Sequence, residues 1–212
     1  MKKKRNSLIT IIYIITSVCF YTYGQEAGSF TDDRDGKVYK TVKIDDQLWM
    51  GENLAFKTES ECWVYDGIRD YVKTHGYLYS WQAATKACPA GWRLPSMQDW
   101  WYLSSELGGD NQAGGKLKES GTSSWKSPNT GATNSSGFTA LSSGRSGDKN
   151  MEHIGNVTFF WTNVDDDDVT SWCAALYSTK RELSLFPTEK KDGYSVRCIK
   201  VSDKVQETTD FW

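Results

Sequence analysis

The 212-residue sequence has only two histidines, His75 and His153. His153 lies in Met151-Glu-His-Ile-Gly155, which lacks the second histidine of a zinc-protease helix. None of the serines stands in the Gly-x-Ser-x-Gly motif that holds many catalytic serines. The sequence also lacks a Cys-x-x-Cys spacing, which disfavours a zinc ribbon or a thioredoxin-like motif. We find no recognisable catalytic group and interpret both histidines as chance placements.

An excess of positive charge is also missing. The chain has 25 lysines and arginines against 27 aspartates and glutamates, a formal net charge of −2. Loss of a leader that contains Lys2, Lys3, Lys4 and Arg5 would make it −6. Nucleic-acid binding needs clustered basic residues that displace counterions, and anionic lipid attracts the same residues. We therefore predict no nucleic-acid partner and no docking on an anionic membrane.

No apolar run is long enough for a membrane span. The run from Leu8 to Phe20 has 13 residues, whereas a spanning helix needs about 20. Basic residues precede it and Thr22-Tyr23-Gly24 follows, which is the layout of a secretory signal peptide. We predict a signal peptide over residues 1–24, export, and no membrane span after cleavage. Lipidation at Cys19 and an uncleaved anchor are the alternatives.

Four cysteines follow the predicted leader, at positions 62, 88, 173 and 198. An even number in an exported chain predicts two disulfides, with three possible connectivities. Each bridge would stabilise the fold by about 2–4 kcal/mol, mainly by restricting the unfolded chain.

Periodicity predicts one α+β domain over residues 35–201, after a polar lead-in at 25–34 and before a flexible tail at 202–212. We expect strands wherever β-branched and aromatic residues alternate. They are a hairpin over Lys37–Glu52 and single strands at Val157–Thr162, Ser171–Tyr177 and Tyr194–Lys200.

Helical spacing predicts two helices. The first carries Leu78, Trp81, Thr85 and Cys88 on one face and stops at Pro89. The second begins after Pro95, where Ser96 and Asp99 have the spacing of a capping box, and ends at Gly108-Gly109. Its buried side is expected to hold Trp100, Leu103 and Leu107.

A long polar segment follows, from Gly114 to Asn150, rich in Gly, Ser, Thr and Asn with isolated apolar residues. So long a segment without periodicity is usually disordered or functional, and the spaced apolar residues favour an ordered loop. Trp125 in this loop is our best candidate for an exposed aromatic side chain, which would suit sugar stacking or a protein contact.

Asp165 to Asp168 form the densest run of charge. Calcium prefers several oxygen ligands, and Asp165, Asp166 and Asp168 are the candidates. The acids are adjacent, however, and do not alternate around a glycine as in a calcium-binding helix–loop–helix. We favour a solvated turn over a calcium site and predict no other cofactor.

Seven short motifs together resemble the Fibrobacter succinogenes major paralogous domain, a family similar to C-type lectin-like folds. The resemblance runs from about Asp35 to Lys200. It implies two helices, small antiparallel sheets and a long irregular loop region. It also implies a Cys88–Cys198 disulfide, with Cys62 and Cys173 as the second pair. The motifs are Asp35-Gly-Lys-Val-Tyr-Lys-Thr-Val-Lys-Ile44, Leu48-Trp-Met-Gly-Glu-Asn-Leu54, Gly76-Tyr-Leu-Tyr-Ser-Trp81, Cys88-Pro-Ala-Gly-Trp-Arg-Leu-Pro95, Thr133-Asn-Ser-Ser-Gly-Phe138, Phe160-Trp-Thr162 and Ser195-Val-Arg-Cys198.

The chain departs from the calcium-dependent lectins at both of their sugar-binding motifs. Ser127-Pro128-Asn129 lacks the acidic residue, and Trp161-Thr162-Asn163 interrupts the second motif. Calcium-dependent sugar binding is therefore not implied, and Asn129 and Asn163 remain ligand-binding candidates beside Trp125. We predict an exported, non-catalytic binding module for a polysaccharide or a surface protein. The alternatives are a carbohydrate-active or formylglycine-generating-enzyme-like enzyme and a structural envelope component.

Overall fold

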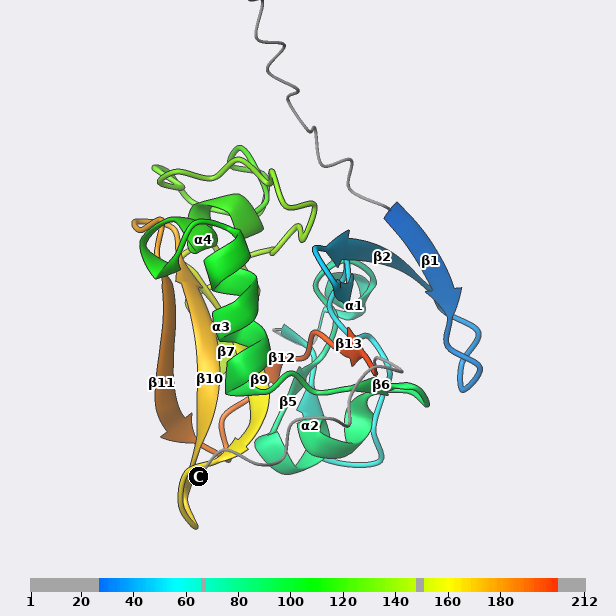
Figure 1. Ribbon diagram of the computed structural model, residues 1–212. Helices are drawn as coiled ribbons and strands as arrows, with labels where there is room; N and C mark the ends of the chain where they lie inside the picture. The colour runs from blue at the N-terminus through cyan, green and yellow to red at the C-terminus, as the bar shows by residue number, and fades with distance from the viewer. Residues whose placement is uncertain (1–26, 66–67, 148–150, 202–212) are drawn as a thin grey trace, which may run out of the picture.

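A computed structural model describes residues 27–65, 68–147 and 151–201. The predicted signal peptide, Cys19 and the predicted tail at 202–212 lie outside these residues. The structure has two large sheets, and Figure 1 shows strands β9, β10 and β11 on one side of the molecule and strands β1 and β2 on the other.

The first sheet has five strands in the order β1-β2-β3-β13-β6, all antiparallel to their neighbours. The predicted hairpin is confirmed, because Ile44 pairs with Gln47 across the two-residue turn at Asp45-Asp46. The strands are β1 (Ala27–Thr31), β2 (Val38–Ile44), β3 (Gln47–Met50), β6 (Trp92–Arg93) and β13 (Ile199–Lys200).

The second sheet has six strands in the order β11-β10-β9-β12-β5-β4. Three long strands form an antiparallel meander, and β12 joins β9 in parallel. A separate ribbon pairs β7 with β8. The strands are β4 (Cys62–Trp63), β5 (Leu78–Tyr79), β7 (Arg145–Ser146), β8 (Met151–Glu152), β9 (Val157–Asp165), β10 (Thr170–Tyr177), β11 (Leu183–Glu189) and β12 (Tyr194–Ser195).

The described residues form four short helices, α1 (Arg69–His75), α2 (Trp81–Ala87), α3 (Met97–Glu106) and α4 (Asp110–Leu117). The predicted capping box of α3 is confirmed: Ser96 Oγ accepts from the Asp99 amide, and the Asp99 carboxylate accepts from the Ser96 amide. The first predicted helix starts too early, because Leu78 and Tyr79 form β5 and the helix begins only after Ser80, its N-cap.

The predicted C-type lectin-like organisation with two helices is wrong. Among the described residues, strands hold 34% and helices 19%, in three sheets and four helices. Two of the four helices come from segments without a clear apolar stripe. In α4, Gly114 and Gly115 face backbone, since a Cβ on them would lie 2.2 Å from Glu182 O and 2.4 Å from Gly131 O. Glycine is selected here for close packing, although it disfavours a helix on propensity alone.

The meander separates two apolar clusters, because successive side chains of a strand point to opposite faces. Phe159, Trp161 and Cys173 lie in one cluster, which α2 covers with Ala84 and Ala87. Their neighbours Phe160, Ala174 and Leu176 lie in the other, which α3 covers with Trp100 and Leu103. Figure 1 shows the green helices α3 and α4 in front of the yellow and orange strands.

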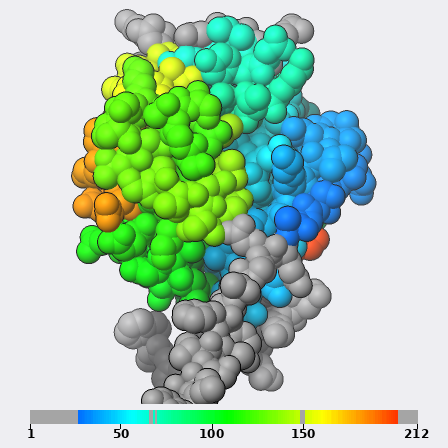
Figure 2. All heavy atoms as spheres, turned by 90° about the horizontal axis from the view of Figure 1, so that it is seen from above, coloured from blue at the N-terminus to red at the C-terminus, as the bar shows by residue number. Residues whose placement is uncertain are grey.

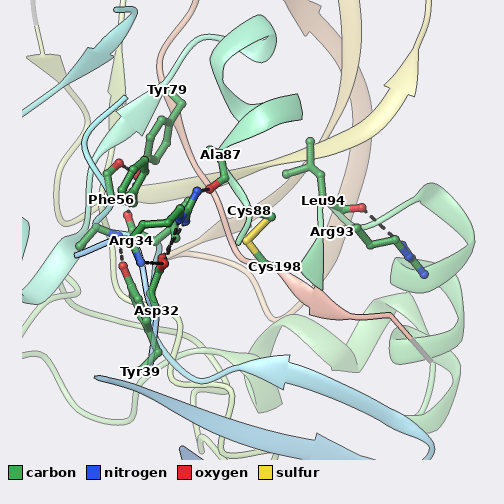
Figure 3. Close-up of a disulfide and its surroundings, with 12 residues drawn as sticks. Asp32, Arg34, Tyr39, Phe56, Tyr79, Ala87, Cys88, Arg93, Leu94 and Cys198 are labelled. Atoms are coloured by element: carbon green, nitrogen blue, oxygen red, sulfur yellow. Dashed lines mark hydrogen bonds and ion pairs between the residues drawn. A yellow bond between two sulfur atoms is a disulfide. The ribbon is translucent and has the colours of Figure 1, made fainter. Parts of the chain in front are cut away.

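A disulfide joins Cys88, at the end of α2, to Cys198, just before β13, as predicted. Figure 3 shows the Arg34 guanidinium beside it. Arg34 donates to Ala87 O at 2.8 Å, pairs with Asp32 at 2.7 Å, and lies 3.7 Å from the centroid of the Phe56 ring. These contacts fasten the chain before β2 to the end of α2.

The second predicted disulfide is wrong, since Cys62 and Cys173 are free thiols. Cys62 lies in β4 and Cys173 in β10, four strand positions apart in the same sheet. Adjacent strands are spaced by about 4.8 Å, so the two lie roughly 19 Å apart along the sheet, and a disulfide needs Cα atoms within about 7 Å. Burial also raises the pKa of the Cys173 thiol, which makes it unreactive.

The segment Tyr194–Lys200 contributes a strand to each large sheet, β12 to the second and β13 to the first. Between these strands, Val196 O accepts from the Leu54 amide at 2.8 Å and Cys198 O accepts from the Met50 amide at 3.0 Å. The two sheets are therefore joined through this short segment.

Candidate functional site

The surface contains a hollow of about 440 Å³ where three separate segments meet. Helix α1 contributes Tyr71 and His75, the long loop contributes residues 122–127, and Ile154 and Gly155 close it after β8. In Figure 2 the green and yellow-green residues of α4 and the following loop cover a contiguous part of one face of the molecule. Sites for small molecules are commonly hollows of about 300–1,000 Å³, so this is our candidate functional site.

Three aromatic rings pack together at α1, and two of them, Tyr71 and His75, line the hollow. The Tyr71 and His75 centroids are 4.9 Å apart, and the Tyr65 and Tyr71 centroids are 5.7 Å apart. Tyr71 and His75 are both partly exposed. A tyrosine in this position offers an apolar ring together with a polar hydroxyl group.

Hydroxyl groups dominate the loop side, with Thr122, Ser123, Ser124 and Ser127 all in the lining. Hydroxyls both donate and accept hydrogen bonds and rotate to suit a partner. Among them, Ser124 Oγ donates to the Glu119 carboxylate at 2.7 Å. The others keep donor and acceptor capacity for a bound molecule.

The arrangement of Ser124 and His75 does not form a catalytic triad, in which a histidine accepts the serine proton. Ser124 donates to Glu119 instead, and His75 Nδ1 lies 2.8 Å from Thr74 Oγ1. Burial lowers the pKa of His75, and the charge of Glu119 opposes that shift. The geometry supports hydrogen bonding to a ligand more than nucleophilic attack.

Trp125 lies in the wall of the hollow, but its side chain is only 1% exposed. Its Nε1 donates to Ala140 O at 2.8 Å, and the Lys118 ammonium lies 5.3 Å from its ring centroid. The prediction of an exposed Trp125 is therefore wrong. The indole is an apolar anchor of the loop, because it buries a large ring and satisfies its one donor internally.

Lys118 is fully buried beneath the same loop. Its ammonium donates to three backbone oxygens, Thr130 O at 3.1 Å, Tyr177 O at 2.9 Å and Lys180 O at 2.7 Å. Burial lowers its pKa to about 8. The three bonds link the long loop to the turn after β10.

Asn129 is also buried, and its Nδ2 donates to Glu119 O at 2.9 Å and to Gly121 O at 2.7 Å. Its Oδ1 has no hydrogen-bond partner in the described part of the chain. Asn129 therefore stabilises the loop from its buried side and does not line the hollow.

Asn163 is exposed and lies outside the lining of the hollow. Its backbone amide donates to Pro95 O at 2.8 Å. The three ligand-binding candidates from the sequence therefore do not converge on one face. Trp125 and Asn129 are packed within the loop, whereas Asn163 sits on β9.

The acidic turn between β9 and β10 is solvated and satisfied by its neighbours. Asp165 pairs with Lys190 at 2.6 Å, and Asp166 accepts from Thr170 Oγ1 at 2.8 Å and from Trp172 Nε1 at 3.2 Å. Asp168 is exposed. Within the described ranges, no group of three or more His, Cys, Asp or Glu side chains could hold a metal ion. The calcium prediction gains no support from this geometry.

Sequence reasoning missed the α1 side of the hollow, because a lone histidine and a lone tyrosine carry no motif. It also missed Trp101, which is 56% exposed on α3. The spacing of Trp100, Leu103 and Leu107 contains that signal, since it places residue 101 off the buried stripe.

The chain was compared with models of protein families. The model described as the Fibrobacter succinogenes major domain matches residues 42–200. No curated protein and no solved structure matches the chain.

Proposed function

The chain belongs to the Fibrobacter succinogenes major domain family, and from that premise we propose that it is an exported, non-catalytic module that binds a saccharide chain in the hollow beside α1. Family membership identifies the scaffold. The proposal for the ligand rests on the chemistry of the hollow itself.

The observation that carries the proposal is that the Tyr71 and His75 rings face a hydroxyl-rich loop across one open hollow. Sugar rings present apolar C–H faces and many hydroxyl groups. Tyr71 offers a ring for the first, and the side chains of residues 122–127 offer donors and acceptors for the second.

The loop is held in place before any ligand arrives. Trp125, Lys118 and Asn129 fix it by three independent sets of internal bonds. A fixed loop loses little conformational freedom on binding, which favours affinity. This supports a binding role for the loop beyond that of a linker.

Export is supported by the disulfide. The Cys88–Cys198 disulfide is the kind of bridge that persists in oxidising compartments. In the described residues, no helix has the length and apolar character to span a bilayer. The predicted signal peptide would direct this export, and it would be tested by N-terminal sequencing of the secreted protein.

A glycan array followed by calorimetric titration of the hits tests the binding role. Wild type should bind at least one saccharide, and Tyr71→Ala should weaken that binding about tenfold or more. Trp101→Ala is the matched control, because it removes an exposed aromatic ring outside the hollow. Absence of any hit, or loss of binding only in the Trp101 variant, would refute the proposed site.

A further inference from the structure

We infer that the saccharide held in this hollow is acidic, with a carboxylate or sulfate group that pairs with the ammonium of Lys126. The inference rests on the proposed function and adds the charge of the ligand to it.

The charge of the lining differs from that of the chain. The whole sequence has slightly more acidic than basic residues. The lining of the hollow has one lysine and neither aspartate nor glutamate. A hollow with a single cation and no anion in its described wall is complementary to a ligand that carries negative charge.

The position of Lys126 is fixed by the backbone on the opposite wall. Its amide donates to Gly155 O at 2.7 Å. A Cβ on Gly155 would lie 2.9 Å from Lys126 Cγ and 3.3 Å from Cδ, so the lysine stem runs directly over this glycine. Gly155 has a φ of +83°, which favours glycine in any case. The stem is packed while the charged end stays at the surface.

No described carboxylate forms an ion pair with Lys126. The acids nearest in sequence to the lining have other partners. Asp70 pairs with Lys73 and Glu152 with Arg145. Glu119 accepts hydrogen bonds from the Ser124 hydroxyl and amide. An ammonium without an internal counter-ion gains more from a ligand anion than one that is already paired.

His75 supplies hydrogen bonds more than charge at neutral pH, because burial lowers its pKa. The anionic group of the ligand is therefore assigned to Lys126 alone. The remaining sugar hydroxyls would be met by Thr122, Ser123 and Ser127, which are exposed around it.

A matched pair of ligands tests the charge directly. Tetragalacturonate and its methyl ester share one backbone, and only the first is anionic. Binding to the purified protein, with its disulfide formed, should be at least tenfold tighter for the free acid. Dextran sulfate against dextran forms the second arm, and a preference confined to that arm would identify sulfate as the anionic group.

Lys126→Met should reduce binding of the preferred acid to the level of its neutral analogue. Lys86→Met, an exposed lysine on α2 outside the hollow, is the control and should bind as wild type does. Thermal unfolding of both variants checks that they fold.

Two adverse outcomes are distinguishable. Equal affinity for charged and neutral analogues, unchanged by Lys126→Met, would overturn the inference and leave the saccharide site standing. Failure of every saccharide to bind, charged or neutral, would overturn the proposed function and this inference with it.

Discussion

The Arg197 guanidinium donates two hydrogen bonds to Asn53 Oδ1, at 2.6 Å and 3.1 Å, and both side chains are buried. Asn53 in turn donates to His75 O at 2.9 Å. Arg197 also lies over the Phe138 ring, 4.4 Å from its centroid. Asn53, Phe138 and Arg197 each come from a different family motif. Their contacts therefore connect three motifs with the end of α1, which borders the hollow.

Asn53→Leu should destabilise the fold by about 1.5–3 kcal/mol, because it removes the oxygen that accepts two hydrogen bonds from the buried Arg197 guanidinium and the donor to His75 O. Urea unfolding followed by tryptophan fluorescence measures the loss. Asn163→Ala, on the exposed side of β9, should change stability by less than about 0.5 kcal/mol. Similar small effects in both variants would contradict the role of the pair.

Cys88→Ser should cost about 2–5 kcal/mol, since the bridge restricts a long stretch of the unfolded chain. Cys62→Ser is the control, because this thiol is free and its removal leaves the bridge in place. Alkylation of the denatured, non-reduced protein followed by peptide mass analysis should label Cys62 and Cys173 and leave Cys88 and Cys198 unlabelled. Labelled Cys88 would argue against the bridge.

Lys118 predicts a specific dependence of stability on pH. Its pKa is lowered by burial to about 8 from an ordinary 10.5. Between these values the unfolded chain binds the proton and the folded chain does not, so unfolding becomes less favourable as the pH rises, by at most about 1.4 kcal/mol per unit.

The measurement is the free energy of unfolding of wild type minus that of Lys118→Met, from pH 7 to pH 10. The variant removes donors from three carbonyl oxygens and should be less stable at every pH. The difference should be flat below about pH 7 and grow above pH 8. A constant difference across the range would show that Lys118 does not titrate there.

Ser96→Ala should destabilise α3 by about 1 kcal/mol, because the Asp99 amide loses its side-chain acceptor. Ser105→Ala, exposed on the same helix, is the control.

Burial raises the pKa of the Asp99 carboxyl, but hydrogen bonds from Arg93 and Ser96 outweigh this effect and hold that pKa below its usual range. The contribution of Asp99 is therefore present above pH 4 and lost as the pH falls through the lowered pKa. The stability of wild type and of Asp99→Asn, followed as the pH is lowered, measures this contribution.

The parts of the fold that sequence predicted are those with strong local signals. The Asp45-Asp46 hairpin, the capping box of α3 and the Cys88–Cys198 bridge all follow from turn chemistry, spacing or the family resemblance. The helix α4 was missed because Gly114 and Gly115 make sense only once Glu182 and Gly131 are seen against them.

The hollow was beyond sequence reasoning for a similar reason. Its walls come from α1, the long loop and the residues after β8, and no local pattern connects them. Trp125 was mistaken for an exposed side chain because its sequence neighbours are polar. The polar residues are at the surface, and the indole turns inward to Ala140 O.

The short segment from Tyr194 to Lys200, which supplies one strand to each large sheet, sets an order of events in folding. The connection between the two sheets, the Arg197 contacts and the disulfide all need residues of this late segment. Contacts of such long sequence separation make folding slow. The protein therefore completes its fold only once this segment is available, and a chain truncated before Tyr194 should remain unable to form either the bridge or the joined sheets.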